Sequence, residues 1–494
     1  MKQNLLLAAA AILLGGILLL PGLHSAVQAE PAITPSPFYT VHAYLPMVNS
    51  LGKGPAGNPT VTATAVQTAT ATNTAVPGAT VTPTATATSV PPTATPTTTP
   101  TKTATPTATA TATPVSGWAI AERPYRVPVT IDMNGAARSD KPAELAMNFT
   151  DQFSSAGESG AFDPNSIRVV EFDKQNSVLN DNVPFQFDPD PAYNARSNAS
   201  GTMVILLEGG SSGRTSRTYH IYFDKVRGTP AEPASVAPHV TLTDGVDDEG
   251  WDSYQINTDG ATYFYHKAGG GFSSLIDGKG NDWINYNKAA GAAGDFRGIP
   301  NLVHPENGGY FHPGRDNVTS SVISQGPLKL TFRSTSVDGA WQTQWEIFPN
   351  YARMTVLKAG GKYWFLYEGT PGGELELDSD FYVVSDGTSG LLSSSWQADL
   401  SAPEWAYFSD PNAVRSLFLV HHEDDSLLDS YYPMDEAMTE FGFGRSGAAR
   451  YLTAVPSQFT LGIANGTSSR TVVGALYNAY APLGISVGPV EEKS

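Results

Sequence analysis

The sequence predicts an all-β protein: a small N-terminal β-sandwich, then a large antiparallel sandwich, preceded by a signal peptide and a disordered stalk. Three observations support this fold class. Short runs of alternating apolar and polar residues, separated by turn residues, recur from residue 117 almost to the end of the chain. Helical spacing of apolar residues is nearly absent, with one short candidate around Met434 to Glu440. The first 116 residues contain an apolar leader and a long stretch with no apolar surface to bury.

The chain opens with a basic start, an apolar run from Leu5 to Leu20 and a Val-Gln-Ala exit. This pattern predicts a signal peptide at residues 1–29, cleaved after Ala29. We therefore expect a secreted or cell-surface, extracellular protein with no membrane insertion after cleavage. The alternative is an uncleaved anchor, because the apolar run is just long enough to span a bilayer.

Residues 30–116 are the expected linker. Thr, Ala and Pro dominate it from about Asn58 to Pro114, a composition that favours extended, polyproline-like chains over a packed core. At about 3.1 Å per residue such a stalk would reach roughly 100 Å or more. It either holds a functional head away from a cell wall or is a passive spacer.

Residues 117–228 are expected to form the small accessory sandwich, with no helix. Its ordinary polar surface favours a supporting or glycan-binding module. A Pro-rich joint, GTPAEPASVAP, follows at residues 228–238. The expected strands of the sandwich are YRVPVTIDM, SIRVVEFD, VPFQFD, GTMVILLEG and RTYHIYFD.

Residues 238–490 continue strand after strand and are expected to form one large sandwich that carries the catalytic site. Tyr and Trp are abundant in these strands. Aromatic side chains stack on sugar rings at binding surfaces, although in strands they more often belong to the core. The expected strands include ATYFYHK, WQTQWEIF, YWFLYEG, SLFLVHHE and TVVGALYNAY.

Composition and motifs exclude several classes of function. The chain has no cysteine, so disulfides, thiolate metal sites and a cysteine nucleophile are excluded. Its net charge of −18 disfavours nucleic acid and anionic lipid as partners. The Gly-x-Gly-x-x-Gly spacing of FGFGRSG (441–447) lacks the βαβ context of a dinucleotide site, but its Arg445 would suit a sugar-binding cleft.

Two segments carry a family resemblance. AGGGFSSLIDGKGNDWI (268–284) resembles the opening hairpin of galactose-mutarotase-like domains, and Arg297-Gly298-Ile299-Pro300, followed by Pro305 and by His312 in FHPGR, is similar to a segment of aldose epimerases. The resemblance implies a two-sheet supersandwich with a concave, sugar-binding face. Mutarotases, polysaccharide lyases and noncatalytic glycosidase domains share this scaffold, so the fold does not select the reaction. Pro follows His312 where the epimerases have Gly, and their later catalytic glutamate motif is not matched.

The irregular segment 297–316 is the first candidate site. Cleavage of a uronic-acid chain by β-elimination needs cations or donors on the carboxylate and a base for the neighbouring proton. In this hypothesis His312 or Tyr310 is the base, and Arg297, Arg315 or His304 meets the substrate carboxylate. The alternative is a long connection whose histidines cap carbonyls and whose arginines pair with nearby acids.

The second candidate is the stretch from residue 416 to 432. On a strand His421 and Glu423 share one face, while His422 and Asp424 share the other. Oxygen ligands from Glu423, Asp424 and Asp425 would suit calcium, although no cofactor is predicted. The alternative is a charged strand end that enters a turn.

Glu368 is the third candidate, because it ends an aromatic strand, YWFLYEG, at a Gly/Pro turn. It would serve as general acid or nucleophile of a glycoside hydrolase if a second carboxyl group lay about 5 to 9 Å away. Glu404, Glu423 and Asp424 are candidate partners, and a turn-capping role is the alternative. The expected sugar contacts are Trp283, Tyr367, His422 and Arg445.

The leading hypothesis is a secreted enzyme that acts on an extracellular polysaccharide, with a lyase as the first choice of reaction. A glycoside hydrolase that uses Glu368 is the second choice. The competing class is a noncatalytic glycan-binding surface protein. The polymer, the mode of attack and the oligomeric state are not predicted.

Overall fold

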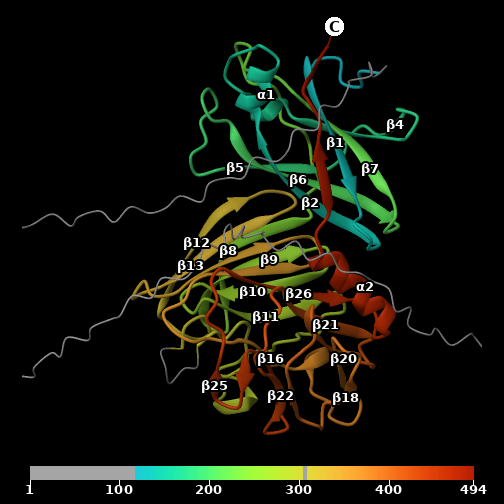
Figure 1. Cartoon of the computed structure of the whole chain (residues 1–494). Coiled ribbons are helices and arrows are strands. Elements are labelled where there is room, and N and C mark those ends of the chain that lie inside the picture. The colour runs from blue at the N-terminus through green and yellow to red at the C-terminus, as the bar shows by residue number, and fades with distance from the viewer. Residues whose placement is uncertain (1–116, 304–308, 494) are drawn as a thin grey trace, which may run out of the picture. The chain divides into compact units, whose positions relative to one another are not determined.

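The computed structural model describes residues 117–303 and 309–493. The expected signal peptide and stalk, together with His304, lie outside these residues. The described chain is predominantly β, as predicted, with antiparallel sheets and two α-helices (Figure 1). Neither helix is long and apolar enough to cross a membrane.

The first sandwich contains two sheets whose inner faces share one apolar core. Along β1 the side chains of Val127, Val129 and Ile131 are fully buried, which is the alternation expected of a strand that faces a core. One sheet has the order β27 (Gly484–Val487), β1 (Tyr125–Asp132), β7 (Ser216–Phe223), β3 (Arg168–Phe172) and β4 (Val178–Asn180), and β28 (Glu491–Glu492) also pairs with β1. The other has the order β2 (Arg138–Asn148), β6 (Ser200–Ser211) and β5 (Phe185–Pro189).

Strand β27 brings the C-terminal part of the chain back to the first sandwich. It pairs with β1 from Val129↔Val487 to Asp132↔Gly484. Figure 1 shows this red strand beside the blue-green β1. Residues from the two ends of the described chain therefore complete one sheet.

The second sandwich is built on a nine-stranded sheet. Its order is β12 (Val318–Gln325), β13 (Leu330–Ser336), β14 (Gln342–Ile347), β15 (Ala352–Lys358), β26 (Ser457–Ala464), β21 (Arg415–His421), β20 (Glu404–Asp410), β17 (Phe381–Val384) and β18 (Ser389–Leu391). One four-stranded sheet has the order β11 (Gly271–Asp277), β10 (Ala261–His266), β9 (Trp251–Thr258) and β8 (Val240–Asp248). Another has the order β16 (Phe365–Gly369), β23 (Met438–Phe443), β22 (Asp429–Met434) and β19 (Trp396–Ala398). The short strands β24 (Arg445–Ser446) and β25 (Ala449–Arg450) form a separate hairpin.

Aromatic contacts join both four-stranded sheets to the nine-stranded sheet. Phe365 of β16 stacks on Phe459 of β26 with 4.4 Å between ring centroids. Phe272 of β11 meets Trp345 of β14 edge-on at 4.6 Å. Most of the strand aromatics therefore belong to the core, where burial of their large apolar area stabilises the fold.

The helices differ from the sequence-based expectation. The prediction that residues 117–228 contain no helix is wrong. Helix α1 (Phe149–Ser155) begins after Asn148, whose side chain accepts hydrogen bonds from backbone N–H groups of the first turn. The segment expected as the strand TVVGALYNAY is helix α2 (Ser469–Tyr480), capped by Ser468. Its buried face has helical spacing, with Val472, Leu476 and Ala479 packed against the nine-stranded sheet.

The helix expected around Met434 to Glu440 is also wrong. This region is the turn between β22 and β23 followed by the first residues of β23. Asp435 and Glu436 have φ angles of 49° and 55°, which a right-handed helix excludes. The described residues also contain the short 3₁₀ turns η1 (Pro164–Ser166), η2 (Gly291–Ala293) and η4 (Pro371–Gly373).

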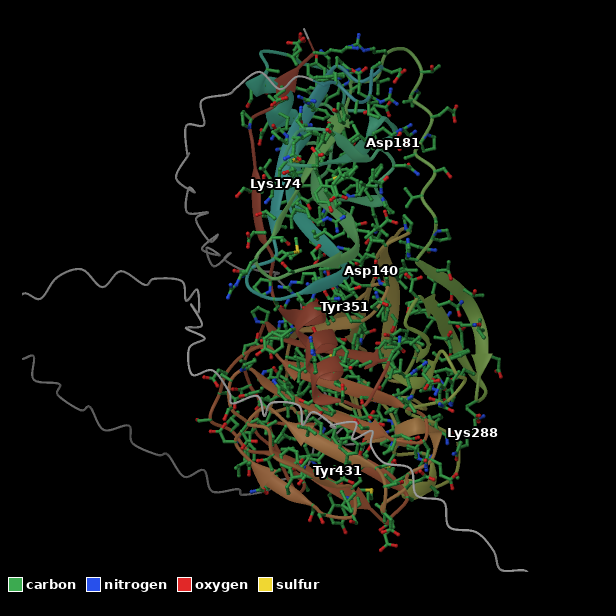
Figure 2. The ribbon with its side chains drawn as sticks, turned by 90° about the vertical axis from the view of Figure 1, so that its right-hand side faces the viewer. Asp140, Lys174, Asp181, Lys288, Tyr351 and Tyr431 are labelled. Atoms are coloured by element: carbon green, nitrogen blue, oxygen red, sulfur yellow. The ribbon has the colours of Figure 1, made fainter. Side chains whose placement is uncertain are left out.

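Charged groups join β2 of the first sandwich to β15 of the second and to the residue that precedes β13. Glu144 on β2 accepts from Lys329 at 3.0 Å and from Arg353 of β15 at 2.7 Å. Close by, the ammonium group of Lys141 donates to the hydroxyl of Tyr351, which is labelled in Figure 2, at 3.2 Å. These bonds connect the first sandwich to the nine-stranded sheet of the second.

Candidate functional site

The candidate site lies on the face of the β16–β23–β22–β19 sheet that is turned away from the large core. Strand alternation determines which side chains reach it. In β16, Phe365 and Tyr367 join the core, so Glu368 points to the opposite face. In β23, Phe441 and Phe443 join the core, and Glu440 points to the same outer face as Glu368.

Glu368 and Glu440 are direct cross-strand neighbours in the β16–β23 pair. The carboxylate of Glu440 is held by the guanidinium group of Arg445 at 2.6 Å. The side-chain amide of Asn301 contacts the carboxyl group of Glu368. Both glutamates are almost fully buried, with 6% and 7% exposure. The fold therefore places two acids side by side and gives them different partners.

This environment shifts the pKa values of the two acids, and their neighbours contribute differently. Burial, together with the negative charge of Glu440, raises the pKa of Glu368 to about 8. Burial also raises the pKa of Glu440, but Arg445 opposes that shift. Glu368 is therefore the member of the pair that holds its proton more readily, and Glu440, paired with Arg445, is the member better placed to carry the negative charge. Such a pair combines an acid and a carboxylate in one place.

Glu368 lines a small cavity of about 30 Å³. This volume accommodates roughly one water molecule. The cavity brings together two residues that the sequence assigned to separate candidate sites, Glu368 and His312. Its walls are formed by Phe296, Asn301, His312, Trp364, Leu366, Glu368, Met434 and Glu440.

A larger groove of about 620 Å³ is bordered by Glu440 but not by Glu368. Glu440 borders both the cavity and the groove. Tyr432 is half-exposed on its wall, while the neighbouring Tyr431, labelled in Figure 2, joins the core. The volume falls in the range of small-molecule sites, roughly 300–1,000 Å³. The groove is lined by Ser395, Trp396, Gln397, Ser430, Tyr431, Tyr432, Glu440, Arg445 and Gly447.

The segment expected as the first site runs directly alongside Glu368. Gly298 exchanges two backbone hydrogen bonds with Glu368, at 2.7 and 3.0 Å. Arg297 is buried, and its guanidinium group donates to the carbonyl oxygens of Asn285, Ala292 and Ala437. Its cation is thus directed at the protein backbone.

The other residues of that segment do not meet at one point. The hydroxyl of Tyr310 donates to Asp338 at 3.0 Å. His312 is buried with Nδ1 2.6 Å from the carbonyl oxygen of Pro313, and it reaches the small cavity. Neither Tyr310 nor Arg315 lines the cavity or the groove. His304 lies outside the described residues.

Of the four expected sugar contacts, Arg445 lines the groove and the others do not. Trp283 is fully buried and donates from Nε1 to Asp277 at 3.2 Å. Tyr367 is also fully buried and donates to the carbonyl oxygen of Trp283 at 2.8 Å. His422 contacts Thr460 at 2.8 Å and the ring of Tyr480 on α2, and burial lowers its pKa to about 4.

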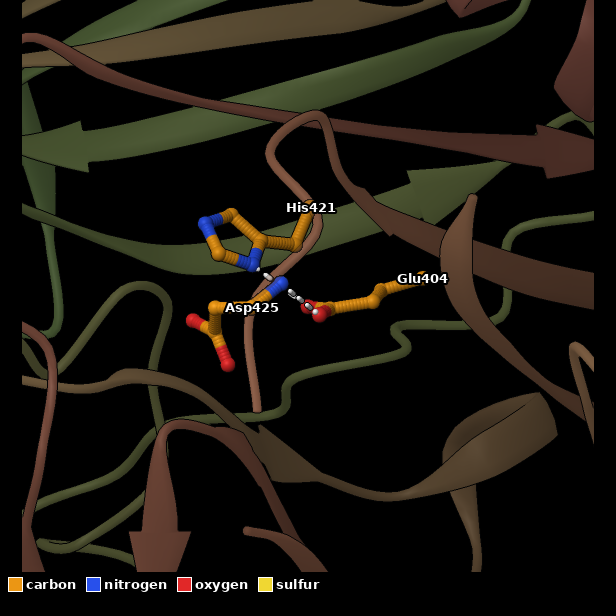
Figure 3. A group of neighbouring side chains, drawn as sticks. All are labelled: Glu404, His421 and Asp425. Carbon is orange, nitrogen blue, oxygen red and sulfur yellow. Dashed lines mark hydrogen bonds and ion pairs between the residues drawn. The ribbon is translucent and has the colours of Figure 1, made fainter. Parts of the chain in front are cut away.

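The region of the second candidate site forms a buried ion pair. His421 Nδ1 lies 2.6 Å from Glu404, whose other oxygen accepts the backbone N–H of Asp425, as Figure 3 shows. His421 Nε2 is 3.2 Å from Glu423. Burial favours the neutral ring, yet the hydrogen bonds and charges of Glu404 and Glu423 raise the pKa of His421 to about 9. Both ring nitrogens are thus engaged by carboxylates.

The predicted calcium ligands, the run Glu423, Asp424 and Asp425, are not the group that this region brings together. Among the described residues here, the side chains close enough to share one ion are Glu404, His421 and Asp425. Glu423 accepts instead from Ser457 and from the backbone N–H of Gln458.

The sequence singled out Glu368 as a candidate but not its neighbour Glu440. Glu440 lies in the segment that was expected to be helical. A helical period was therefore assumed there, although Thr439, Glu440 and Phe441 alternate between the two faces of strand β23. The period-two pattern of MTEFGF would have placed Glu440 opposite the core aromatics. The pairing of β16 with β23 is a long-range contact, which one sequence does not reveal.

Comparison with known proteins finds similar solved structures but no match by sequence. No protein-family model matches the sequence, and no curated protein does. An alpha-mannosidase from Enterococcus faecalis V583 is similar in structure, with a TM-score of 0.36, 9% identity, and coverage of 75% of this chain and 46% of that one. A glycosyl hydrolase family 38 protein from Enterococcus faecalis has a TM-score of 0.36, 8% identity, and coverage of 74% and 49%. The chain spans about half the length of either protein.

Proposed function

We propose that this chain binds a glycan in the groove beside Tyr432 and hydrolyses a glycosidic bond with Glu368 and Glu440. The observation that carries the proposal is the cross-strand pair itself. It joins Glu368, whose raised pKa favours the protonated acid, to Glu440, a carboxylate held by Arg445 that borders an aromatic groove. Aromatic rings with a few fixed polar groups are the usual lining of such sites.

The chemistry requires one proton donor and one carboxylate. Glu368 gives its proton to the glycosidic oxygen as the bond from the anomeric carbon to that oxygen breaks. Glu440 attacks the anomeric carbon and forms a glycosyl ester. Water then cleaves the ester, and the ionised Glu368 takes the proton of that water, so both acids regain their initial states.

The pairing also predicts the stereochemical outcome. Directly opposite residues of antiparallel strands have Cβ atoms about 4.5–5.5 Å apart, so side chains of equal length on the same face bring their carboxyl groups close together. Retaining glycosidases hold their two carboxyl groups about 5–5.5 Å apart, whereas inverting enzymes leave more room for a water. The pair therefore favours net retention of configuration at the anomeric carbon.

The contacts of the opening segment favour hydrolysis over β-elimination. A lyase needs a cation to meet the carboxylate of its substrate. The guanidinium of Arg297 is occupied by backbone carbonyls, and that of Arg445 by Glu440. A hydrolase needs only the two acids, which are already in place.

A substrate panel tests the proposal. The full chain is incubated with neutral and acidic polysaccharides and with aryl glycosides. Release of reducing ends without an unsaturated, ultraviolet-absorbing product is expected. Appearance of that product would instead establish a lyase, and retardation on glycan affinity gels without any product would establish a noncatalytic binder.

Tyr432→Ala is expected to weaken glycan binding about two- to tenfold, because one stacking ring is worth about 0.5–1.5 kcal/mol. The side chain is 50% exposed, so the unfolding midpoint should change little. Binding is measured by affinity electrophoresis or calorimetry. Leu179→Ala, which truncates another exposed apolar side chain on β4, is the control. Equal affinity of the Tyr432 variant and wild type would remove the groove from the binding site.

A further inference from the structure

Three carboxylates gather at one end of the large sheet, away from the acid pair of the proposed function. They belong to Glu376 in the loop after η4, to Asp380 just before β17, and to Asp410 at the end of β20. One ligand oxygen from each lies within 4.8 Å of the others. Strands β17 and β20 are hydrogen-bonded neighbours, so the sheet itself fixes two of the three.

Asp380 leaves one oxygen unsatisfied in this cluster. Its side chain is fully buried, with 0% exposure. Oδ2 accepts the backbone N–H of Glu376 at 2.9 Å, whereas Oδ1 has no hydrogen-bond partner. A buried carboxylate oxygen without a partner is costly, and such atoms are rare in folded proteins.

The cluster also has no cationic partner among the residues that the structure describes. Within residues 117–303 and 309–493, no Lys, Arg or His forms an ion pair with Glu376, Asp380 or Asp410. Buried charges in proteins are normally paired with an opposite charge or bound to a metal ion.

The surroundings of Asp410 hold its carboxylate in a fixed orientation. Oδ1 accepts the backbone N–H groups of Asn412 at 2.6 Å and Ala413 at 3.0 Å. Oδ2 lies against Gly372, whose φ is 65°, and a Cβ at that position would come within 1.6 Å of the oxygen. Glycine therefore allows the loop to approach the carboxylate this closely.

We infer that Glu376, Asp380 and Asp410 bind a divalent cation of the calcium type. All the ligands are carboxylate oxygens, which favour hard cations. Calcium–oxygen distances of about 2.3–2.6 Å place ligands around one ion up to about 5 Å apart, which matches the cluster. Bound calcium would link the connection that follows β16, and hence Glu368, to strands β17 and β20.

Titration of the full chain with calcium chloride, after treatment with a chelator, tests this site. Calorimetry is expected to show one site per chain, and the unfolding midpoint is expected to rise by about 5 °C at saturating calcium. Terbium, a luminescent analogue of calcium, gives an independent signal. Asp380→Asn and Asp410→Asn are expected to weaken binding at least tenfold.

Asp378→Asn is the matched control, because it removes one negative charge from the same loop at an exposed position outside the cluster. It should bind calcium like the wild type. Equal losses in Asp378→Asn and Asp380→Asn would reveal a general charge effect and overturn the site. The wild-type titration is decisive even if the other variants fail to fold.

Protonation is the competing way to relieve the cluster, since burial and the charges of Asp410 and Glu376 raise the pKa of Asp380 to about 7. In that case wild-type protein would show neither calcium binding nor a shifted midpoint, which would overturn the inference. The result is separate from the test of hydrolysis, because calcium binding is measured without any glycan.

Discussion

Glu368→Gln is expected to lower the kcat of glycan hydrolysis about 10³-fold. The amide keeps the shape of the side chain but has no acidic proton to give to the leaving oxygen, and general acid catalysis typically contributes about 10²–10⁴-fold. The rate is measured as release of reducing ends under saturating substrate. Glycan binding should persist, because the groove is lined by other residues.

Two further variants test whether the loss of activity is specific to the acid pair. Glu440→Gln should be similarly inactive, because it removes the attacking carboxylate. Glu436→Gln changes an exposed acid in the turn before β23 and should be as active as the wild type. Hydrolysis by Glu368→Gln at the wild-type rate would exclude this acid from the mechanism.

The raised pKa of Glu368 also predicts how the rate of glycan hydrolysis changes with pH. The proposed reaction needs the protonated acid, whose pKa is about 8. Activity should therefore fall as pH rises above about 8, and the fall should be absent from any residual activity of Glu368→Gln. A pH–rate profile of kcat measures this limb.

The second large effect concerns stability. Glu404→Gln is expected to lower the free energy of unfolding by about 3 kcal/mol at pH 6, because it leaves the buried, protonated His421 without its closest counter-charge. The loss is measured by denaturant unfolding. Asp424→Asn, an exposed neighbour on the same loop, is the control and should be nearly neutral.

The stabilisation by His421 should depend on pH with a defined sign. Its pKa in the folded protein is about 9, above the unfolded value of about 6.5. The contribution is therefore fully present below about pH 6.5 and is lost as pH rises through 9. The difference between wild type and Glu404→Gln should shrink from pH 6 to pH 9.5; a constant difference would contradict a charged His421.

The all-β fold could be predicted because strand alternation is local. In runs such as YRVPVTIDM and WQTQWEIF, apolar residues recur at every second position. This pattern can be recognised in the sequence without knowing which strands pair. Helix α2 was missed because Val472 and Val473 favour strands by propensity. Packing of its apolar face against the large sheet decided the outcome.

The candidate site was predictable only in part. Glu368 stood out because it ends an aromatic strand at a turn, but its neighbour Glu440 is set by strand order, which arises from long-range packing. The same limit applies to Arg297, since the sequence shows a cation in a loop but not the carbonyl groups that surround it.

The pairing of β27 with β1 has a consequence for biosynthesis. The ribosome releases β1 early, yet one edge of this strand has no partner until residues 484–487 emerge. During that interval the nascent chain exposes open backbone N–H and C=O groups to other extended chains. A chaperone that shields β1 would therefore raise the yield, and a nonsense mutation before residue 484 would leave this edge permanently open to aggregation.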